Sequence, residues 1–268
     1  MPASSMVGLP ELADLDGDGD EDLLTNALDG YSSGDLIYHQ NTGTATSPAF
    51  AAAVTNPFGS TVSGYIAAPA LADIDDDGDL DLFMGEASPY GLAITYQENT
   101  GTATAPAFGT PITNPFGITG VTGEVVFPEF ADIDDDGDLD LFTGNVYGEI
   151  WFYRNTGTAS SPAFAAPALN PFGLSSTYYL AAPALTDLDR DGDMDMLVGE
   201  EGGDFQYFEN TGTAGSPAFA TPRGNHFGLT SVYDLAFPDF SDIDDDGDMD
   251  LFVGEYYGDI LFFRNTSI

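Results

Sequence analysis

The chain has 268 residues and a formal net charge of −41, with 45 acidic residues against four arginines and no lysine. So few cations exclude nucleic acid and anionic membrane surfaces as partners, because both are bound through basic side chains. Hydrophobic residues make up 43% of the chain, enough for a core, yet no stretch reaches the ~20 apolar residues of a membrane span. The chain lacks cysteine, which excludes disulfides and thiolate chemistry.

The chain begins with Met1–Met6, which has neither the basic nor the apolar region of a signal peptide. We expect that a signal has been removed or that the chain was cut from a longer parent. Val7–Ala13 follows as a short predicted strand and leads directly into the first acidic stretch.

The acidic stretch is nine residues long and occurs five times, with starts 59, 59, 55 and 55 residues apart. The five copies start at Asp14, Asp73, Asp132, Asp187 and Asp242 and hold 29 of the 45 acidic residues. Such regular recurrence predicts one continuous repeat array rather than separate domains. The approximate repeat bounds are 7–63, 64–122, 123–177, 178–232 and 233–268.

Each acidic stretch is predicted to fold around a calcium ion, about one ion per repeat and five in all. Carboxylates at loop positions 1, 3, 5 and 9, with Gly at position 6 for a sharp turn, surround a hard cation with oxygen alone. These predicted ligands are Asp14, Asp16, Asp18, Asp22, Asp73, Asp75, Asp77, Asp81, Asp132, Asp134, Asp136, Asp140, Asp187, Asp189, Asp191, Asp195, Asp242, Asp244, Asp246 and Asp250. Position 7 is predicted to bind through its backbone carbonyl, with its side chain left to water or to an outer contact. It is Asp20, Asp79, Asp138, Asp193 or Asp248.

Two other interpretations fit the acidic stretch less well. Asp and Gly form solvated turns, but five copies of the same ordered ladder exceed what turn chemistry requires. An EF-hand needs a bidentate Glu at position 12 and flanking helices. Here position 12 is Thr, Met or Val, and each loop runs into a short apolar stretch ending on Gly, such as Leu141–Gly144. The loop is therefore predicted to lie between two strands.

The third copy shows the strand pattern that each repeat is predicted to form. Its predicted strands are Val125–Ala131, Leu139–Gly144, Gly148–Asn155 and Ser161–Ala165, and Asn170–Gly173 leads to the next copy. Four short antiparallel strands per repeat, recurring around a ring, are typical of β-propeller blades. The fold class is therefore all-β, a five-bladed propeller, with an excised fragment of a larger array as the alternative.

The last repeat differs from the others at its end. It stops at Asn265–Ile268, after a third strand, and Met1–Met6 is too short to supply a fourth. We predict a three-stranded last blade, or one covered by a partner chain, because an open strand edge invites pairing. The expected state is otherwise a monomer.

The motifs together resemble the FG-GAP repeat of integrin α-subunit propellers. They are Phe-Gly before the first strand, the loop Asp-x-Asp-x-Asp-Gly-Asp-x-Asp-Leu, and the Val-Gly that closes the second strand. Bacterial VCBS repeats are similar too, through aromatic-x-Asn-x-Gly segments. The resemblance covers nearly the whole chain, although such propellers commonly have seven blades. It implies calcium in the loop between the first two strands, in a secreted or cell-surface recognition or adhesion protein.

The favoured function is recognition of an extracellular glycan or protein by a calcium-binding propeller. Tyrosines in the hairpin loops suit sugar stacking or protein contact, because the ring is flat and apolar with a polar tip. They are Tyr90, Tyr147, Tyr256 and Tyr257. Other aromatics are expected in packed strands, namely Trp151, Tyr178 and Tyr179. The alternative is a purely structural unit of a larger surface array.

An enzyme is not expected from the sequence. The copies are nearly equivalent, whereas an active site usually breaks the symmetry, and His39 and His226 lie at unrelated positions. A polysaccharide-acting enzyme that depends on carboxylates is the weaker alternative. Its candidate residues follow the second strands, namely Glu86, Glu200, Glu201 and Glu255.

Overall fold

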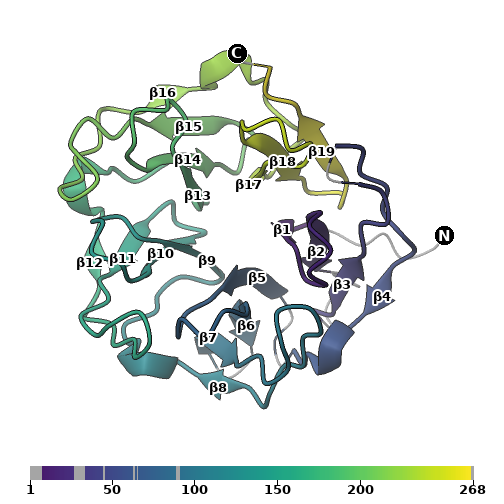
Figure 1. The fold of residues 1–268 in the computed structure, drawn as a ribbon. Helices are drawn as coiled ribbons and strands as arrows, with labels where there is room; N and C mark the ends of the chain where they lie inside the picture. The colour runs from purple at the N-terminus through teal and green to yellow at the C-terminus, as the bar shows by residue number, and fades with distance from the viewer. Residues whose placement is uncertain are drawn as a thin grey trace.

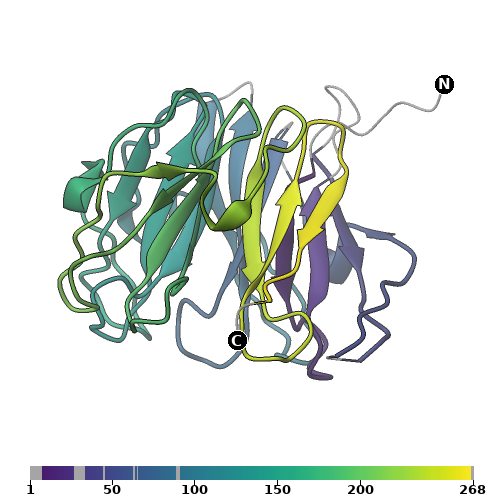
Figure 2. The same ribbon diagram turned by 90° about the horizontal axis from the view of Figure 1, so that it is seen from above.

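The computed structural model describes residues 8–26, 34–44, 46–62, 64, 66–88 and 91–266. Five antiparallel sheets surround a common axis, and each sheet places its first strand innermost (Figure 1). The strands run between two rims of the ring (Figure 2). The prediction of an all-β, five-bladed propeller is confirmed, with four sheets of four strands and one of three among the described residues.

The strands follow one order in every blade. Blade 1 contains β1 (Glu11–Ala13), β2 (Asp22–Asn26), β3 (Leu36–His39) and β4 (Val54–Thr55). Blade 2 contains β5 (Ile66–Ala72), β6 (Asp81–Ser88), β7 (Gly91–Gln97) and β8 (Ile112–Thr113). Blade 3 contains β9 (Val126–Ala131), β10 (Asp140–Asn145), β11 (Ile150–Tyr153) and β12 (Ala168–Leu169). Blade 4 contains β13 (Ala182–Thr186), β14 (Asp195–Gly199), β15 (Phe205–Phe208) and β16 (Arg223–Gly224). Blade 5 contains β17 (Phe237–Ser241), β18 (Asp250–Gly254) and β19 (Ile260–Phe263).

The second strands form the centre of each blade. β2, β10, β14 and β18 are buried along their whole length. A strand with a neighbour on either side, and a blade packed against each face, has no solvated side, so it lacks polar alternation. This explains why the stretches after the acidic loops are continuously apolar.

The fourth strand was predicted at the wrong residues. The structure places β12 at Ala168–Leu169, whereas Ser161–Ala165 belongs to a turn with two isolated bridges, Thr158–Ser161 and Asn155–Phe164. The Phe164 side chain explains the difference. It is 7% exposed and packs into the junction with the neighbouring blade instead of extending a sheet.

Short 3-10 turns link the blades. They are η1 (Pro57–Gly59), η2 (Pro115–Gly117), η3 (Pro171–Gly173) and η4 (His226–Gly228). Each has a phenylalanine at positive φ, for example Phe58 at 55°, a conformation that costs an L-residue energy unless its surroundings fix it. The Phe58 carbonyl accepts a hydrogen bond from Phe108 of the next blade at 2.9 Å. The turn thereby joins two neighbouring blades.

Glycine in the second strand of blades 2 to 5 lets neighbouring blades approach closely. A Cβ at Gly144 would overlap the backbone carbonyl of Ala181, and one at Gly254 would overlap that of Gly8. The second contact joins blade 5 to blade 1, where the Gly8 N–H also donates to the Glu255 carbonyl at 3.4 Å. The ring therefore closes by side-by-side packing, and the prediction of a three-stranded last blade is confirmed.

None of the described residues belongs to a helix that is long and apolar enough to cross a membrane.

Candidate metal centre and axial carboxylates

The acidic loops share one backbone conformation, shown here for the third copy. The Asp132 carboxylate accepts the N–H groups of Asp136 and Gly137 at 3.1 and 3.0 Å. Asp135 and Gly137 have φ of 54° and 91°. Alternating left-handed residues fold the loop around the carboxylate of position 1, and Gly is needed where φ is largest. The side chains of later positions then point to a common centre.

Carboxylate oxygens converge in all five loops. In each group, one oxygen from each of three side chains lies within 4.8 Å of the others. Four groups use positions 1, 3 and 5, as in Asp132, Asp134 and Asp136; the fourth loop uses Asp187, Asp189 and Asp195. The predicted ligands at positions 1 and 3 are thus brought together in every loop, and position 5 in four of them.

Several of these oxygens are buried and lack any hydrogen-bond partner among the described residues. At position 3 the unpartnered atoms are Oδ1 of Asp16, Asp75, Asp134 and Asp244. At position 7 they are Oδ1 of Asp79, Asp138, Asp193 and Asp248. A buried carboxylate oxygen without a partner is costly, and a hard divalent cation would satisfy it. The donor set therefore fits calcium, and the position 7 side chains turn inward, a feature the sequence pattern did not indicate.

Position 9 has a structural contact in every loop. The five aspartates are at most 2% exposed, and each accepts a backbone N–H from the Asn after the third strand at 2.6 or 2.7 Å. In blades 1, 2 and 4 a tyrosine hydroxyl donates to the second oxygen. Phe152 and Phe262 replace that tyrosine in blades 3 and 5, which leaves Oδ2 of Asp140 and Asp250 unpartnered. Burial raises the pKa of Asp140 to about 7.

The residue before that Asn sorts the loops into classes, which the sequence analysis missed. Arg154 contacts Asp134 at 2.6 Å in loop 3, and Arg264 pairs with Asp244 in loop 5. Loops 2 and 4 have Glu98 and Glu209 at this position. The Glu98 charge adds to burial and to the other loop carboxylates in raising the pKa of Asp75. Loop 1 has Gln40, which donates to Asp16. The position before the Asn therefore brings an arginine to loops 3 and 5 and a glutamate to loops 2 and 4. Arg190 of loop 4 adds a further cation, which contacts Asp248 of loop 5 at 3.3 Å.

Three acidic side chains on the innermost strands face the axis, and sequence reasoning missed them as well. Glu11 accepts from Leu71 N–H at 2.7 Å, and Glu129 accepts from Leu185 N–H at 2.9 Å. Asp239 accepts from Leu12 N–H at 2.8 Å and so spans the junction between blades 5 and 1. The counterparts in blades 2 and 4 are alanines, Ala70 and Ala184. That alternation was the available signal, because it breaks the equivalence of the copies.

The axial carboxylates have perturbed acidities. Burial raises the pKa of Glu129 to about 8 and that of Asp239 to about 7. Burial also raises the pKa of Glu11, with the charges of Asp239 and Glu129 adding to the effect. Glu129 and Asp239 are therefore poised to exchange a proton near neutral pH.

An apolar pocket of about 280 Å³ lies next to the axial carboxylates, at the preceding inward-facing positions of the same inner strands. Leu9, Phe127 and Phe237, each two residues before an axial carboxylate, line it, and the two phenylalanine rings lie 5.2 Å apart. Tyr179 also lines it and is 52% exposed, while its neighbour Tyr178 is 77% exposed. The expectation that these tyrosines belong to packed strands is therefore wrong.

The remaining aromatic candidates divide by exposure. Tyr147 and Tyr257 are exposed, Tyr256 and Trp151 are half-buried, and Tyr90 lies outside the described residues. Tyr178 and Tyr179 escaped the prediction because their segment, expected to be a strand, is an irregular connection in which Tyr179 has φ of 52°.

The buried glutamates after the second strands accept hydrogen bonds from nearby hairpins and connections. Glu200 accepts from Tyr178 N–H at 3.0 Å, and Glu255 accepts from Tyr257 N–H at 2.9 Å. Glu86 accepts from the Thr95 hydroxyl at 3.2 Å, whereas Glu201 is exposed. These contacts make the buried glutamates acceptors that hold the hairpins. His39 contacts the Ala51 carbonyl, and His226 stacks on Tyr207.

The ring of five antiparallel sheets, with an Asp-x-Asp-x-Asp-Gly-type loop after each first strand, defines a five-bladed propeller with an acidic loop in every blade. The family model of the FG-GAP-like repeat matches residues 14–84, 73–143, 132–198 and 187–253. These matches run through most of the sequence, and the chain belongs to the FG-GAP-like repeat family. A comparison with curated proteins gave no match.

Solved structures with a similar fold include two glycoside hydrolases and a lectin. The catalytic domain of the Coprinopsis cinerea GH62 α-L-arabinofuranosidase is 14% identical with a TM-score of 0.58, and the alignment covers 94% of this chain and 85% of that one. The Xanthomonas citri GH43_1 enzyme complexed with xylotriose is 11% identical with a TM-score of 0.54, covering 94% and 82%. An Agrocybe aegerita lectin that recognises non-reducing terminal N-acetylglucosamine is 16% identical with a TM-score of 0.44, covering 92% and 61%. At these identities the likeness shows the fold alone.

The expectation that the chain is not an enzyme must be corrected. It depended on the near-equivalence of the five copies, but two glycoside hydrolases share the fold over 94% of this chain. The copies also differ at the axis, where three blades carry a carboxylate and two carry alanine. Near-equivalent blades are therefore no argument against catalysis.

Proposed function

We propose that this chain is a calcium-stabilised propeller that recognises glycans outside the cell, as a secreted or cell-surface protein. The observation that carries the proposal is the convergence of carboxylates in five loops, with buried oxygens that no described residue satisfies. Calcium, when bound, would supply the positive charge that these oxygens lack. Extracellular modules commonly bind calcium at ~10⁻⁴ to 10⁻³ M, which suits an environment of millimolar calcium.

The residues that would hold the ion are those at positions 1, 3 and 5, with further contributions from positions 7 and 9. Loop 3 shows the role of each position. Asp132 organises the backbone, Asp134 supplies an unpartnered oxygen, and Asp138 adds a second from the inward side. Asp140 connects the loop to the third strand through Asn155 N–H. Filling the loop would therefore tighten the contact between the first three strands of a blade.

The glycan surface is proposed at the axial pocket and the tyrosines beside it. Tyr179 lines the pocket, and the Tyr178 ring packs edge-on against the Tyr179 ring, with the two ring centroids 4.8 Å apart. Tyr233 and Tyr257 form a second exposed pair at 5.0 Å. Aromatic faces with polar tips bind the apolar faces of sugar rings while meeting their hydroxyls. Exposed paired tyrosines beside an apolar hollow are the features that favour a glycan over a charged ligand.

The proposal is tested by calorimetric calcium titration of chelator-treated protein, followed by glycan-array binding in millimolar calcium. We expect a stoichiometry approaching five, and a glycan signal that Tyr179→Ala removes and that Ile112→Ala, at an exposed position of the outermost strand β8, retains. The absence of calcium binding would refute the metal part of the proposal. An unchanged array signal in Tyr179→Ala would refute the assignment of the surface.

A second candidate is glycoside hydrolysis at the axis. Glu11, Glu129 and Asp239 lie on three inner strands, each two residues after a residue that lines the apolar pocket. The pKa of Glu129 is raised to about 8 and that of Asp239 to about 7, which suits proton transfer near neutral pH. Two glycoside hydrolases with this fold supply the first substrates to try, xylo-oligosaccharides and α-L-arabinofuranosides. Any activity should be lost in Glu129→Gln and kept in Glu149→Gln, whose side chain contacts Trp151 and Asn145 instead. Equal activity in both variants would exclude the axial site.

A further inference from the structure

The junctions between complete blades are filled by one phenylalanine each. Phe108, Phe164 and Phe219 are 8%, 7% and 6% exposed, and each lies in the apolar cluster between its own blade and the preceding one. Their N–H groups donate to the carbonyls of the 3-10 phenylalanines of that preceding blade at 2.8–2.9 Å. This phenylalanine is therefore both a side-chain plug and a backbone link.

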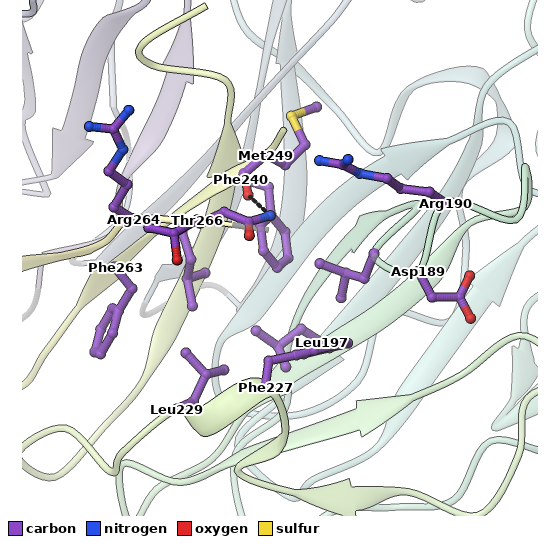
Figure 3. A pocket seen from close by; sticks show the side chains of 13 residues that line it. Asp189, Arg190, Leu197, Phe227, Leu229, Phe240, Met249, Phe263, Arg264 and Thr266 are labelled. Atoms are coloured by element: carbon purple, nitrogen blue, oxygen red, sulfur yellow. Dashed lines mark hydrogen bonds between the residues drawn. The ribbon is translucent and has the colours of Figure 1, made fainter. Parts of the chain in front are cut away.

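The junction between blades 4 and 5 has the same walls, but no described phenylalanine takes the corresponding place. Phe219 packs in a cluster with Ile133, Leu174, Met196 and Phe208. The residues 55 positions further on are Leu188, Leu229, Leu251 and Phe263. These counterparts line a cavity of about 550 Å³ (Figure 3). The cavity therefore lies where a phenylalanine side chain packs in the other junctions.

The surface around this cavity is left open in the same way. Leu261 and Phe262 on β19 are 38% and 48% exposed, whereas their counterparts Trp151 and Phe152 pair with Leu169 and Ala168 of β12. Within the described part of the chain, no donor reaches the Phe227 carbonyl. The sheet edge, the cavity and this carbonyl thus match the three contacts that a fourth-strand segment makes elsewhere.

The far side of blade 5 lacks the complementary contact. Phe50 of blade 1 is 39% exposed, and no described carbonyl accepts its N–H. Elsewhere the acceptor is the 3-10 phenylalanine of the preceding blade, as Phe116 accepts from Phe164 N–H. That acceptor lies eight residues after the phenylalanine plug of its own blade, as Phe116 follows Phe108. One segment with that spacing would reach from the cavity, across β19, to Phe50.

We propose that this face binds an extended, uncharged segment of a partner polypeptide that carries two phenylalanines eight residues apart. The first ring would fill the cavity, the segment would pair with β19, and the carbonyl of the second phenylalanine would accept from Phe50 N–H. The templates are the segments of the chain itself, such as Asn155–Gly173, which contains no charged residue. A neutral segment is favoured over a second whole copy, because two chains of −41 repel each other.

The experiment uses a labelled synthetic peptide with the sequence of residues 155–176, titrated with the full chain in millimolar calcium and followed by fluorescence anisotropy. We expect saturable binding at one peptide per chain, weakened at least about tenfold by Phe164→Ala in the peptide. A scrambled peptide should not bind. Absence of saturable binding, or equal binding of the Phe164→Ala peptide, would overturn the proposal.

The register is tested by cross-linking, since the chain has no cysteine of its own. Leu261→Cys in the chain should form a disulfide with a Leu169→Cys peptide, by analogy with the Trp151–Leu169 pair. A Ser175→Cys peptide is the matched control and should react far less. Equal reaction of the two peptides would overturn the register. Dimers of the chain that the peptide fails to dissociate would assign the face to a second copy instead.

Discussion

Removal of calcium should lower the stability of the whole ring. In each loop three carboxylate oxygens lie within 4.8 Å of one another, a separation at which two unit charges repel by about 0.9 kcal/mol even in bulk water. A site with a Kd of ~10⁻⁴ to 10⁻³ M contributes about 0.7–1.8 kcal/mol of stability at roughly 2 mM calcium. Five independent sites then contribute about 3–9 kcal/mol. For a domain of this size that corresponds to a fall in Tm of at least about 6 °C.

The assay is thermal unfolding followed by circular dichroism, with chelator and then with calcium restored. Magnesium in place of calcium is the control, because its smaller octahedral shell suits a flexible, all-oxygen loop less well. We expect calcium to restore the full Tm and magnesium to restore less of it. A melting curve that moves by less than about 2 °C on chelation would refute the interpretation of the loops as cation sites.

Three further changes test separate parts of the structure. Arg154→Gln removes the internal cation of loop 3 and should lower the Tm in chelator more than in calcium, whereas Glu98→Gln in loop 2 should raise the Tm in chelator; differential scanning calorimetry in both buffers distinguishes them. Glu129→Gln should raise the Tm relative to the parent protein, and by more as the pH rises from 5 to 8. The folded-state pKa of Glu129 is about 8, against an ordinary value near 4.5, so between these values folding requires the carboxyl to stay protonated or to be buried as an anion, and the parent protein loses stability that the Gln variant keeps. Gly144→Ala should destabilise the fold by about 1–3 kcal/mol in urea unfolding, because its Cβ would overlap the Ala181 carbonyl; an unchanged midpoint would contradict the close approach of the blades.

The sequence predicted the ring because its signals are local and repeated. The acidic loop has its own turn chemistry, and the apolar stretch after it, such as Leu141–Gly144, is short and bounded by Gly, so the strand pair follows from neighbouring residues. The fourth strand was misplaced because Phe164 serves the adjacent blade. A contact across a junction leaves no periodicity in the segment that makes it.

The site was predictable only where the loop itself determines it. Convergence of positions 1 and 3 follows from the backbone turn, but the inward side chain of Asp138 depends on burial that the pattern does not encode. Glu129 and its axial partners come from three different blades, and only closure of the ring brings them together. Tyr179 was misjudged because an aromatic pair in a strand-like segment is usually packed, and here the connection turns it toward solvent.

The closure between blades 5 and 1 has a mechanical consequence. Among the described residues no strand is shared across that seam, which is held by the Gly254–Gly8 contact and by two hydrogen bonds, from Gly8 N–H to Glu255 and from Leu12 N–H to Asp239. Tension that pulls blade 5 away from blade 1 would load this seam directly. The ring would open at this seam, and the blades would then unfold one after another. Each acidic loop, with its cation bound, would stabilise its own blade against that unfolding.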